Sequence, residues 1–297
     1  MIAAPIPAWQ AQPDVWLVVA ALAIGYWVAV VRLGPRLVSP VEPIVTRLQV
    51  VSFSLGVFAV WLASDWPIHA VAEQMNYSVH MVQHLIFSMV AAPLILLGTP
   101  AWLLRWILGA PSRRFVVVRW LARFVPALII FNLVLVITHW PAIVNAGLGS
   151  VWIHFGLHAI LFLSSLIVWL PVFSPLPEIP RLGDPLRLLY LFAQSILPIV
   201  PASFLTYGAT PLYRFYVGQP HLWGISTIGD QQIAGLIMKI AAGIILWFLI
   251  AVLFFRWAAD EQKPSQLVRP DGNGTTGDQL GNARIISKQT TNVQGAL

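Results

Sequence analysis

Seven apolar stretches in this chain are each long enough to cross a membrane, which restricts the possible folds more than any other feature. A helix rises ~1.5 Å per residue, so about 20 residues cross the ~30 Å hydrocarbon layer. Backbone polar groups in lipid must bond within the protein, which favours helices. We therefore predict an all-α polytopic membrane protein with seven transmembrane helices, at about residues 14–32, 48–64, 79–98, 124–139, 151–171, 187–207 and 232–256.

The overall composition supports this prediction. Hydrophobic residues make up 58% of the chain and charged residues only 9%, and the mean hydropathy is +0.79. A soluble protein does not need so apolar a composition. The formal net charge of +6 does not indicate a nucleic-acid partner, because the basic residues lie in predicted loops where anionic lipid headgroups are the expected partner.

The basic residues also predict the orientation of the chain. They cluster in alternate loops, namely Arg32, Arg36 and Arg47, then Arg105, Arg113, Arg114, Arg119 and Arg123, then Arg181 and Arg187. The other loops contain only Arg214. Under the positive-inside rule the N-terminus is outside and the C-terminus is cytoplasmic, which an odd number of spans requires.

The chain divides into two parts of different character. Residues 1–258 form the predicted seven-helix membrane domain, in which the segment 112–123 mixes Arg with Phe, Val and Trp as an interfacial helix does. From residue 259 to 297 polar and small residues dominate, and too few large apolar residues remain to bury a core. We predict that residues 259–297 form a disordered cytoplasmic tail.

Histidine provides the main chemical signal. His80 and His84 are four residues apart, as are His154 and His158, and His139 ends the fourth predicted span. Residues four apart lie on one face of a helix, so each pair can direct two imidazoles at one ion. All five fall in the predicted outer half of the membrane. Each could instead form only a weak interhelical hydrogen bond, worth ~0.6 kcal/mol, but ionisable groups in a bilayer favour a functional explanation.

Copper is the ion that we expect at this site. The chain contains no cysteine, so a soft-metal ligand must be histidine or methionine. Imidazole suits copper, and thioethers favour Cu(I); Met75, Met81 and Met238 lie in the predicted outer half. Haem is the main alternative cofactor, although two imidazoles one helical turn apart suit a compact ion better than a macrocycle.

Two further residues are candidates for roles near the metal. Asp230 precedes the seventh predicted span, where it could cap the helix N-terminus or orient a ligating imidazole. Met238 lies on the same predicted helix, but Lys239 places a cation beside it, which argues against a ligand role. Gly147, Gly149 and Gly156 would allow helices to approach closely within one chain or in a homo-oligomer.

Four segments together resemble the CtaG family of cytochrome c oxidase assembly factors, multi-spanning bacterial proteins found with oxidases of the caa type. They are YSVHMVQHLIFSMVAAPLILLGTP from Tyr77, HWP from His139, HFGLH from His154 and DQQIAGLIM from Asp230. The resemblance runs from about residue 45 to 258. The matching histidines are His80, His84, His139, His154 and His158, while His69 and His221 fall outside the segments.

The resemblance implies a non-enzymatic role in the bacterial plasma membrane, with a cytochrome c oxidase subunit as the partner. The protein would bind copper through the five histidines and assist its insertion into the oxidase. No nucleophile triad, phosphate loop or nucleotide fingerprint argues for catalysis. A membrane transporter or a haem-bearing redox protein remains the alternative.

The topology generates the first testable prediction. Single cysteines introduced into this cysteine-free chain at Gly147 and near residue 1 should react with a membrane-impermeant thiol reagent from outside, and one near residue 297 only after lysis. Labelling of Gly147→Cys only from the cytoplasm would contradict the predicted orientation, and with it the depth assigned to the histidines.

Overall fold

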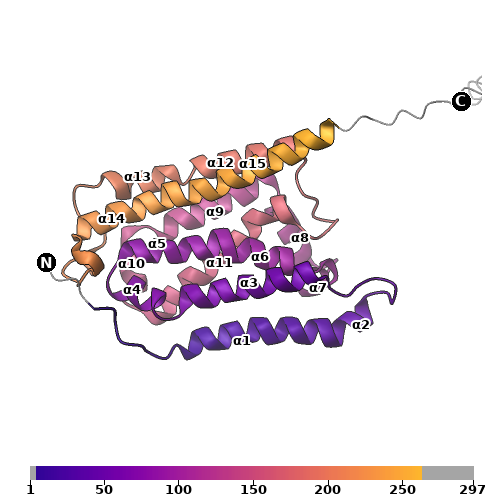
Figure 1. Cartoon of the computed structure of the whole chain (residues 1–297), viewed down its shortest axis with the longest axis horizontal. Coiled ribbons are helices and arrows are strands. Elements are labelled where there is room, and N and C mark those ends of the chain that lie inside the picture. The colour runs from indigo at the N-terminus through magenta and orange to yellow at the C-terminus, as the bar shows by residue number, and fades with distance from the viewer. Residues whose placement is uncertain (1–4, 263–297) are drawn as a thin grey trace, which may run out of the picture. The chain divides into compact units, whose positions relative to one another are not determined.

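The computed structural model describes residues 5–262, which form helices and loops without a strand (Figure 1). Six helical segments in this part of the chain are each long and apolar enough to cross a membrane. They agree closely with six of the predicted spans, and they cover Pro13–Leu37, Arg47–Gln74, Tyr77–Gly98, Val151–Phe173, Asp184–Tyr207 and Thr227–Glu261.

The fourth predicted span, at about residues 124–139, corresponds to a shorter helix, α9 (Phe124–Thr138), of 15 residues. At ~1.5 Å per residue α9 is about 22 Å long, less than the ~30 Å of a hydrocarbon layer. It is long enough to count as a membrane span only when it is taken together with α8 (Arg113–Leu121). The two helices are bent by 85° relative to each other. The structure therefore has six spanning helices, or seven if α9 crosses the membrane.

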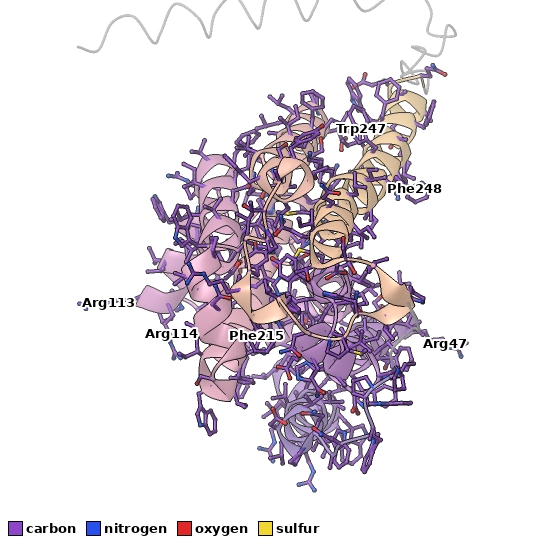
Figure 2. All side chains as sticks on the ribbon, turned by 90° about the vertical axis from the view of Figure 1, so that its left-hand side faces the viewer. Arg47, Arg113, Arg114, Phe215, Trp247 and Phe248 are labelled. Atoms are coloured by element: carbon purple, nitrogen blue, oxygen red, sulfur yellow. The ribbon has the colours of Figure 1, made fainter. Side chains whose placement is uncertain are left out.

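The bend between α8 and α9 has the geometry that an interfacial helix requires. Phe115 of α8 is buried, whereas Arg113 and Arg114 are exposed and point away from the ribbon in Figure 2. The short helix α7 (Ala101–Leu108) precedes α8 in the chain. The predicted interfacial segment 112–123 is thus a helix nearly perpendicular to the one that follows.

Several spans are interrupted helices. The first comprises α1 (Pro13–Val28), the π-helical η1 (Ala29–Leu33) and α2 (Gly34–Leu37). The third comprises α5 (Tyr77–Leu85), the π-helical η2 (Ile86–Ala91) and α6 (Ala92–Gly98), and the last comprises α14 (Thr227–Leu236), the π-helical η5 (Ile237–Ala241) and α15 (Ala242–Glu261). Pro198 separates α12 (Asp184–Ile196) from α13 (Ile199–Tyr207), because proline cannot donate the helical hydrogen bond.

The span formed by α5, η2 and α6 is the most buried part of the bundle. It packs against α3 (Arg47–Ser64) on one side and α11 (Val151–Phe173) on the other. Gly98 makes the contact with α3 possible, since a Cβ atom there would lie 2.6 Å from the Cα of Phe53. In contrast α1 buries none of its residues and lies beside α3 at the edge of the bundle (Figure 1).

Two short helices lie at the end of the bundle that holds the histidines. They are α4 (Ile68–Gln74), which follows α3 after a break, and α10 (Pro141–Leu148), which follows α9. A Cβ atom on Gly147 would lie 2.8 Å from Leu157, so this glycine allows α10 to approach α11. Gly156 has open space around it. The predicted close helix approach therefore occurs within one chain at Gly147.

Contacts divide the chain into residues 1–255, which hold the bundle, and residues 256–297. The helix α15 continues to Glu261, so it includes the first residues of the predicted tail, which begins at residue 259. The remainder of the predicted tail, from residue 263 onward, lies outside the described residues.

The buried carboxylate of Asp230 joins α14 to the start of α5. It accepts hydrogen bonds from the backbone N–H of Tyr77 at 2.6 Å, from the Asn76 amide at 2.9 Å, and from the backbone N–H and hydroxyl of Ser78. The expected N-cap role in its own helix was wrong, because Ser226 caps α14 through the N–H of Gly229. Asp230 instead satisfies the free N–H groups at the N-terminus of α5.

The second prediction concerns this interaction. Asp230→Asn should lower the free energy of unfolding by about 1.5–3 kcal/mol, because an amide replaces a charged acceptor that is surrounded by donors. Thermal unfolding in detergent would measure the change, with Glu42→Gln at an exposed loop position as the control. Equal midpoints for the two variants would show that the contact does not stabilise the bundle.

Candidate metal centre

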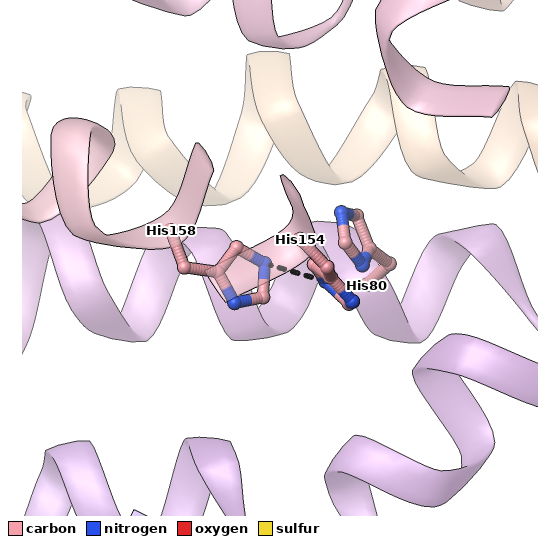
Figure 3. Close-up of side chains that lie close together, drawn as sticks. All are labelled: His80, His154 and His158. Atoms are coloured by element: carbon pink, nitrogen blue, oxygen red, sulfur yellow. Dashed lines mark hydrogen bonds between the residues drawn. The ribbon is translucent and has the colours of Figure 1, made fainter. Parts of the chain in front are cut away.

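Three histidines from two helices converge inside the bundle. His80 on α5 faces His154 and His158 on α11, and one ring nitrogen from each lies within 4.8 Å of the others (Figure 3). The ring centroid of His80 is 5.6 Å from that of His154 and 5.4 Å from that of His158. This arrangement brings together residues that are more than 70 positions apart in the sequence.

The local helical geometry explains the pairing within each helix. His154 and His158 occupy successive turns of α11, and their Nε2 atoms are 3.1 Å apart. His80 and His84 occupy successive turns of α5, with ring centroids 4.3 Å apart. A hydrogen bond of 2.7 Å from the indole of Trp169 to the backbone oxygen of Ser88 holds the two helices together farther along the bundle.

A carboxylate from α4 orients His154. The Nδ1 atom of His154 forms a short contact with Oε1 of Glu73, so Nδ1–H donates and the Nε2 lone pair faces His158. Carboxylates often hold metal-ligating histidines in this way, and they make the imidazole a better ligand. An N–H···N hydrogen bond from Nε2 of His158 to this lone pair accounts for the 3.1 Å between the two atoms.

His69 binds the same carboxylate oxygen from the other side. The Gln83 amide donates to the backbone oxygen of Ala63 at 2.8 Å and to Nδ1 of His69 at 3.1 Å. His69 therefore carries its proton on Nε2, which is 3.4 Å from Oε1 of Glu73. The chain of contacts from Gln83 through His69 to Glu73 fixes the carboxylate that orients His154.

His84 and His139 form a second hydrogen-bonded chain. Nδ1 of His139 lies 2.7 Å from the backbone oxygen of Leu135 and donates to it, which leaves Nε2 as an acceptor. Nδ1 of His84 is 3.3 Å from that Nε2 atom and donates to it. His84 therefore keeps a free lone pair on Nε2, while both nitrogens of His139 are used.

Three buried imidazole nitrogens have no hydrogen-bond partner among the described residues. Two belong to this group, Nδ1 of His80 and Nε2 of His84, and the third is Nδ1 of His221, outside it. Leaving a buried polar atom unpaired costs about 1–3 kcal/mol. His80, His84, His154 and His158 line a cavity of ≈ 10 Å³, together with residues of α9, α10 and α11. A metal ion in this space would satisfy the free lone pairs, since an ion with imidazole ligands binds them at about 2.0–2.1 Å.

The structure distinguishes among the five histidines predicted as ligands. His80, His154 and His158 form the cluster, and His84 is next to it with a free lone pair. His139 lies behind His84 and holds its ring, so its contacts favour an orienting role instead of direct ligation. His221 hydrogen-bonds with Thr227 at 3.0 Å outside this group.

Met238 lies on the other side of His84. Met81, His84, His139 and Met238 line one cavity of ≈ 40 Å³ between α5, α9 and η5. The ammonium group of Lys239 lies 4.6 Å from the centre of the Tyr207 ring, which stabilises its charge through a cation–π contact. Asp230 contacts the first turn of α5, so it positions the helix that carries His80 and His84.

The sequence analysis missed His69 and Glu73. Both lie in α4, between two of the predicted spans, and the family segments do not include them. Their spacing of four residues was the available signal, because it places an imidazole and a carboxylate on one helical face. Only the fold shows that this face meets His154.

The third prediction separates ligands from orienting residues. His158→Ala should abolish metal binding. His139→Ala should retain the metal stoichiometry but weaken the affinity for the metal by about 10–100-fold, as loss of a residue that orients a ligand does. Metal titration of the purified protein would measure both, with His221→Ala as a control that binds normally. Equal loss of metal in all three variants would contradict this assignment.

Comparison with known proteins identifies the family. Searches of curated proteins and of solved structures returned no match. A family model described as cytochrome c oxidase caa3 assembly factor matches residues 24–260, which include the C-terminal part of α1, all of α2 to α14, and α15 except its last residue. This multi-pass bacterial membrane protein therefore belongs to the cytochrome c oxidase caa3 assembly factor family.

Proposed function

We propose that this protein binds copper in the histidine cluster and assists its insertion into cytochrome c oxidase. The observation that carries the proposal is the convergence of His80, His154 and His158, with the free lone pair of His84 beside them. Membership of an assembly-factor family implies association with the oxidase. An assembly role of this kind requires binding and transfer, without catalytic turnover.

The donor set supports copper as the ion. The candidate ligands are neutral imidazoles, which suit copper. The chain has no cysteine that would favour a thiolate site. Glu73 is the carboxylate that contacts the cluster in the described part of the chain. One negative charge balances a monovalent ion, and uncompensated charge in a membrane bundle is costly. This balance favours Cu(I) over Cu(II).

The size of the central space supports an ion over a haem. The cavity that the four imidazoles line measures ≈ 10 Å³, and adjacent ring centroids lie between 4.3 and 5.6 Å apart. A porphyrin between these rings would require the helices to separate. The same arrangement also differs from a transport pathway, because the imidazoles converge on one another instead of being spread along a channel.

The fourth prediction tests the ion and its destination together. Purified protein should contain copper and show no Soret band. Cells lacking the protein should accumulate an oxidase that holds its haems but lacks its active-site copper. Oxidase activity should return with wild-type protein or His221→Ala, and should fail to return, at normal protein abundance, with His80→Ala, His84→Ala, His154→Ala or His158→Ala.

Different outcomes would identify different errors. A Soret band in the purified protein would favour a haem-bearing redox protein. An oxidase with its full copper complement in the deletion strain would rule out copper delivery. Full copper stoichiometry in both His84→Ala and His158→Ala would leave these residues as interhelical hydrogen-bonding groups, since loss of such a bond seldom unfolds a bundle.

A further inference from the structure

The histidine end of the bundle is covered by the segment 208–226, between α13 and α14. This segment contains the short 3₁₀ helices η3 (Arg214–Tyr216) and η4 (Leu222–Gly224). Figure 2 looks onto this end, and the light-orange chain near Phe215 crosses the bundle. Tyr213 donates to the backbone oxygen of His139 at 2.9 Å, and Tyr216 donates to that of Ala72 at 2.6 Å.

Three buried tyrosines lie between this segment and the cluster. Tyr77 stacks on His80 with ring centroids 5.6 Å apart, and Tyr213 and Tyr216 pack on Tyr77 at 4.2 and 5.6 Å. Their exposed fractions are 1%, 3% and 1% for Tyr77, Tyr213 and Tyr216. Burial raises the pKa of Tyr213 to about 12, so it remains a neutral donor. The three rings therefore cover His80 on the side of segment 208–226.

A cavity of ≈ 360 Å³ instead reaches the cluster from the side. It lies between α1, α3, α4 and α11, with Val18 and Leu22 on the α1 wall. His154 and His158 of the cluster line it, as do His69 and Glu73. Asp14, in the first turn of α1, lies at its rim, close enough to interact electrostatically with His69. The cavity thus has polar groups next to the cluster and an apolar outer wall.

Glu73 lines this cavity and is also bound to the cluster. Its Oε1 atom contacts both His69 and His154. The side chain of Glu73 is 32% exposed, compared with 7% for His154. The Glu73 carboxylate is accessible from the cavity and contacts His154, a ligand of the cluster. It is therefore a suitable first ligand for a cation.

The wall formed by α1 is held by few contacts. The indole of Trp16 donates to Asp65 at 2.9 Å, and the hydroxyl of Tyr26 donates to the backbone oxygen of Gly98 at 2.9 Å. A further cavity of ≈ 420 Å³ lies along α1 and α3, beside the stacked rings of Tyr26 and Phe53. An element that buries little surface can open at low free-energy cost.

We propose that the copper ion enters and leaves the cluster sideways through the cavity lined by α1, with Glu73 as its first protein ligand. This inference rests on the proposed function. From Glu73 the ion reaches His154 and His158 by exchanging ligands one at a time, so it is never without a donor. Movement of α1 widens the path, while the three tyrosines continue to cover His80.

The fifth prediction uses a matched pair of variants on α1. Val18→Trp fills the cavity, and Leu17→Trp places the same side chain at the neighbouring position, which is 71% exposed and does not line the cavity. Anaerobic loading with Cu(I), and its removal by a Cu(I) chelator, should be at least tenfold slower in Val18→Trp, with unchanged final stoichiometry. Leu17→Trp should match the wild type.

Two further variants keep the test decisive. Leu22→Trp fills the cavity from another position, so it replaces Val18→Trp if that variant does not fold. Glu73→Gln keeps an oxygen for His69 and His154 but loses the charge, and it should also slow loading. Equal rates in the Val18 or Leu22 variant and Leu17→Trp would overturn the side route, as would faster loading in Tyr216→Phe. A wild-type protein that binds no copper would instead refute the proposed function.

Discussion

The burial of several imidazoles at one end of an apolar helix bundle is the constraint on which the rest of the structure depends. Each ring nitrogen there must bond to a neighbour or remain unpaired at a cost of about 1–3 kcal/mol. Backbone oxygens and the Glu73 carboxylate satisfy some of these atoms, and they determine the tautomers of His139 and His154. The lone pairs that remain on His80 and His84 are those that an ion would satisfy.

The helices that carry the cluster are themselves positioned by polar contacts at the same end. Asp230 of α14 satisfies the first turn of α5, and Tyr213 and Tyr216 connect the segment before α14 to His139 and α4. These contacts join the elements at this end of the bundle. The helix α1, which buries none of its residues, lines the cavity next to His154 and His158, whereas η5 lines the cavity next to His84. Different elements therefore hold the ligands in place and border the side cavity.

This separation suits the function that we propose for a member of an assembly-factor family. A site that delivers an ion must bind it tightly and still allow exchange. Four imidazoles near one small cavity provide the first property, and a side cavity with Glu73 at its inner end provides the second. The charge of Glu73 contributes to both, because it orients His154 and attracts a cation.

The sequence alone determined the helical membrane fold and the positions of most spans, because the length and hydropathy of each span are local properties. It also determined that His80, His84, His154 and His158 lie in pairs, since a spacing of four is fixed by helical geometry. Only the tertiary structure decided that Glu73 meets His154, that His139 lies behind His84, and that Asp230 caps α5. These contacts join residues that are 55 to 153 positions apart in the sequence. Their geometry depends on how the helices pack, and no local sequence pattern predicts that packing.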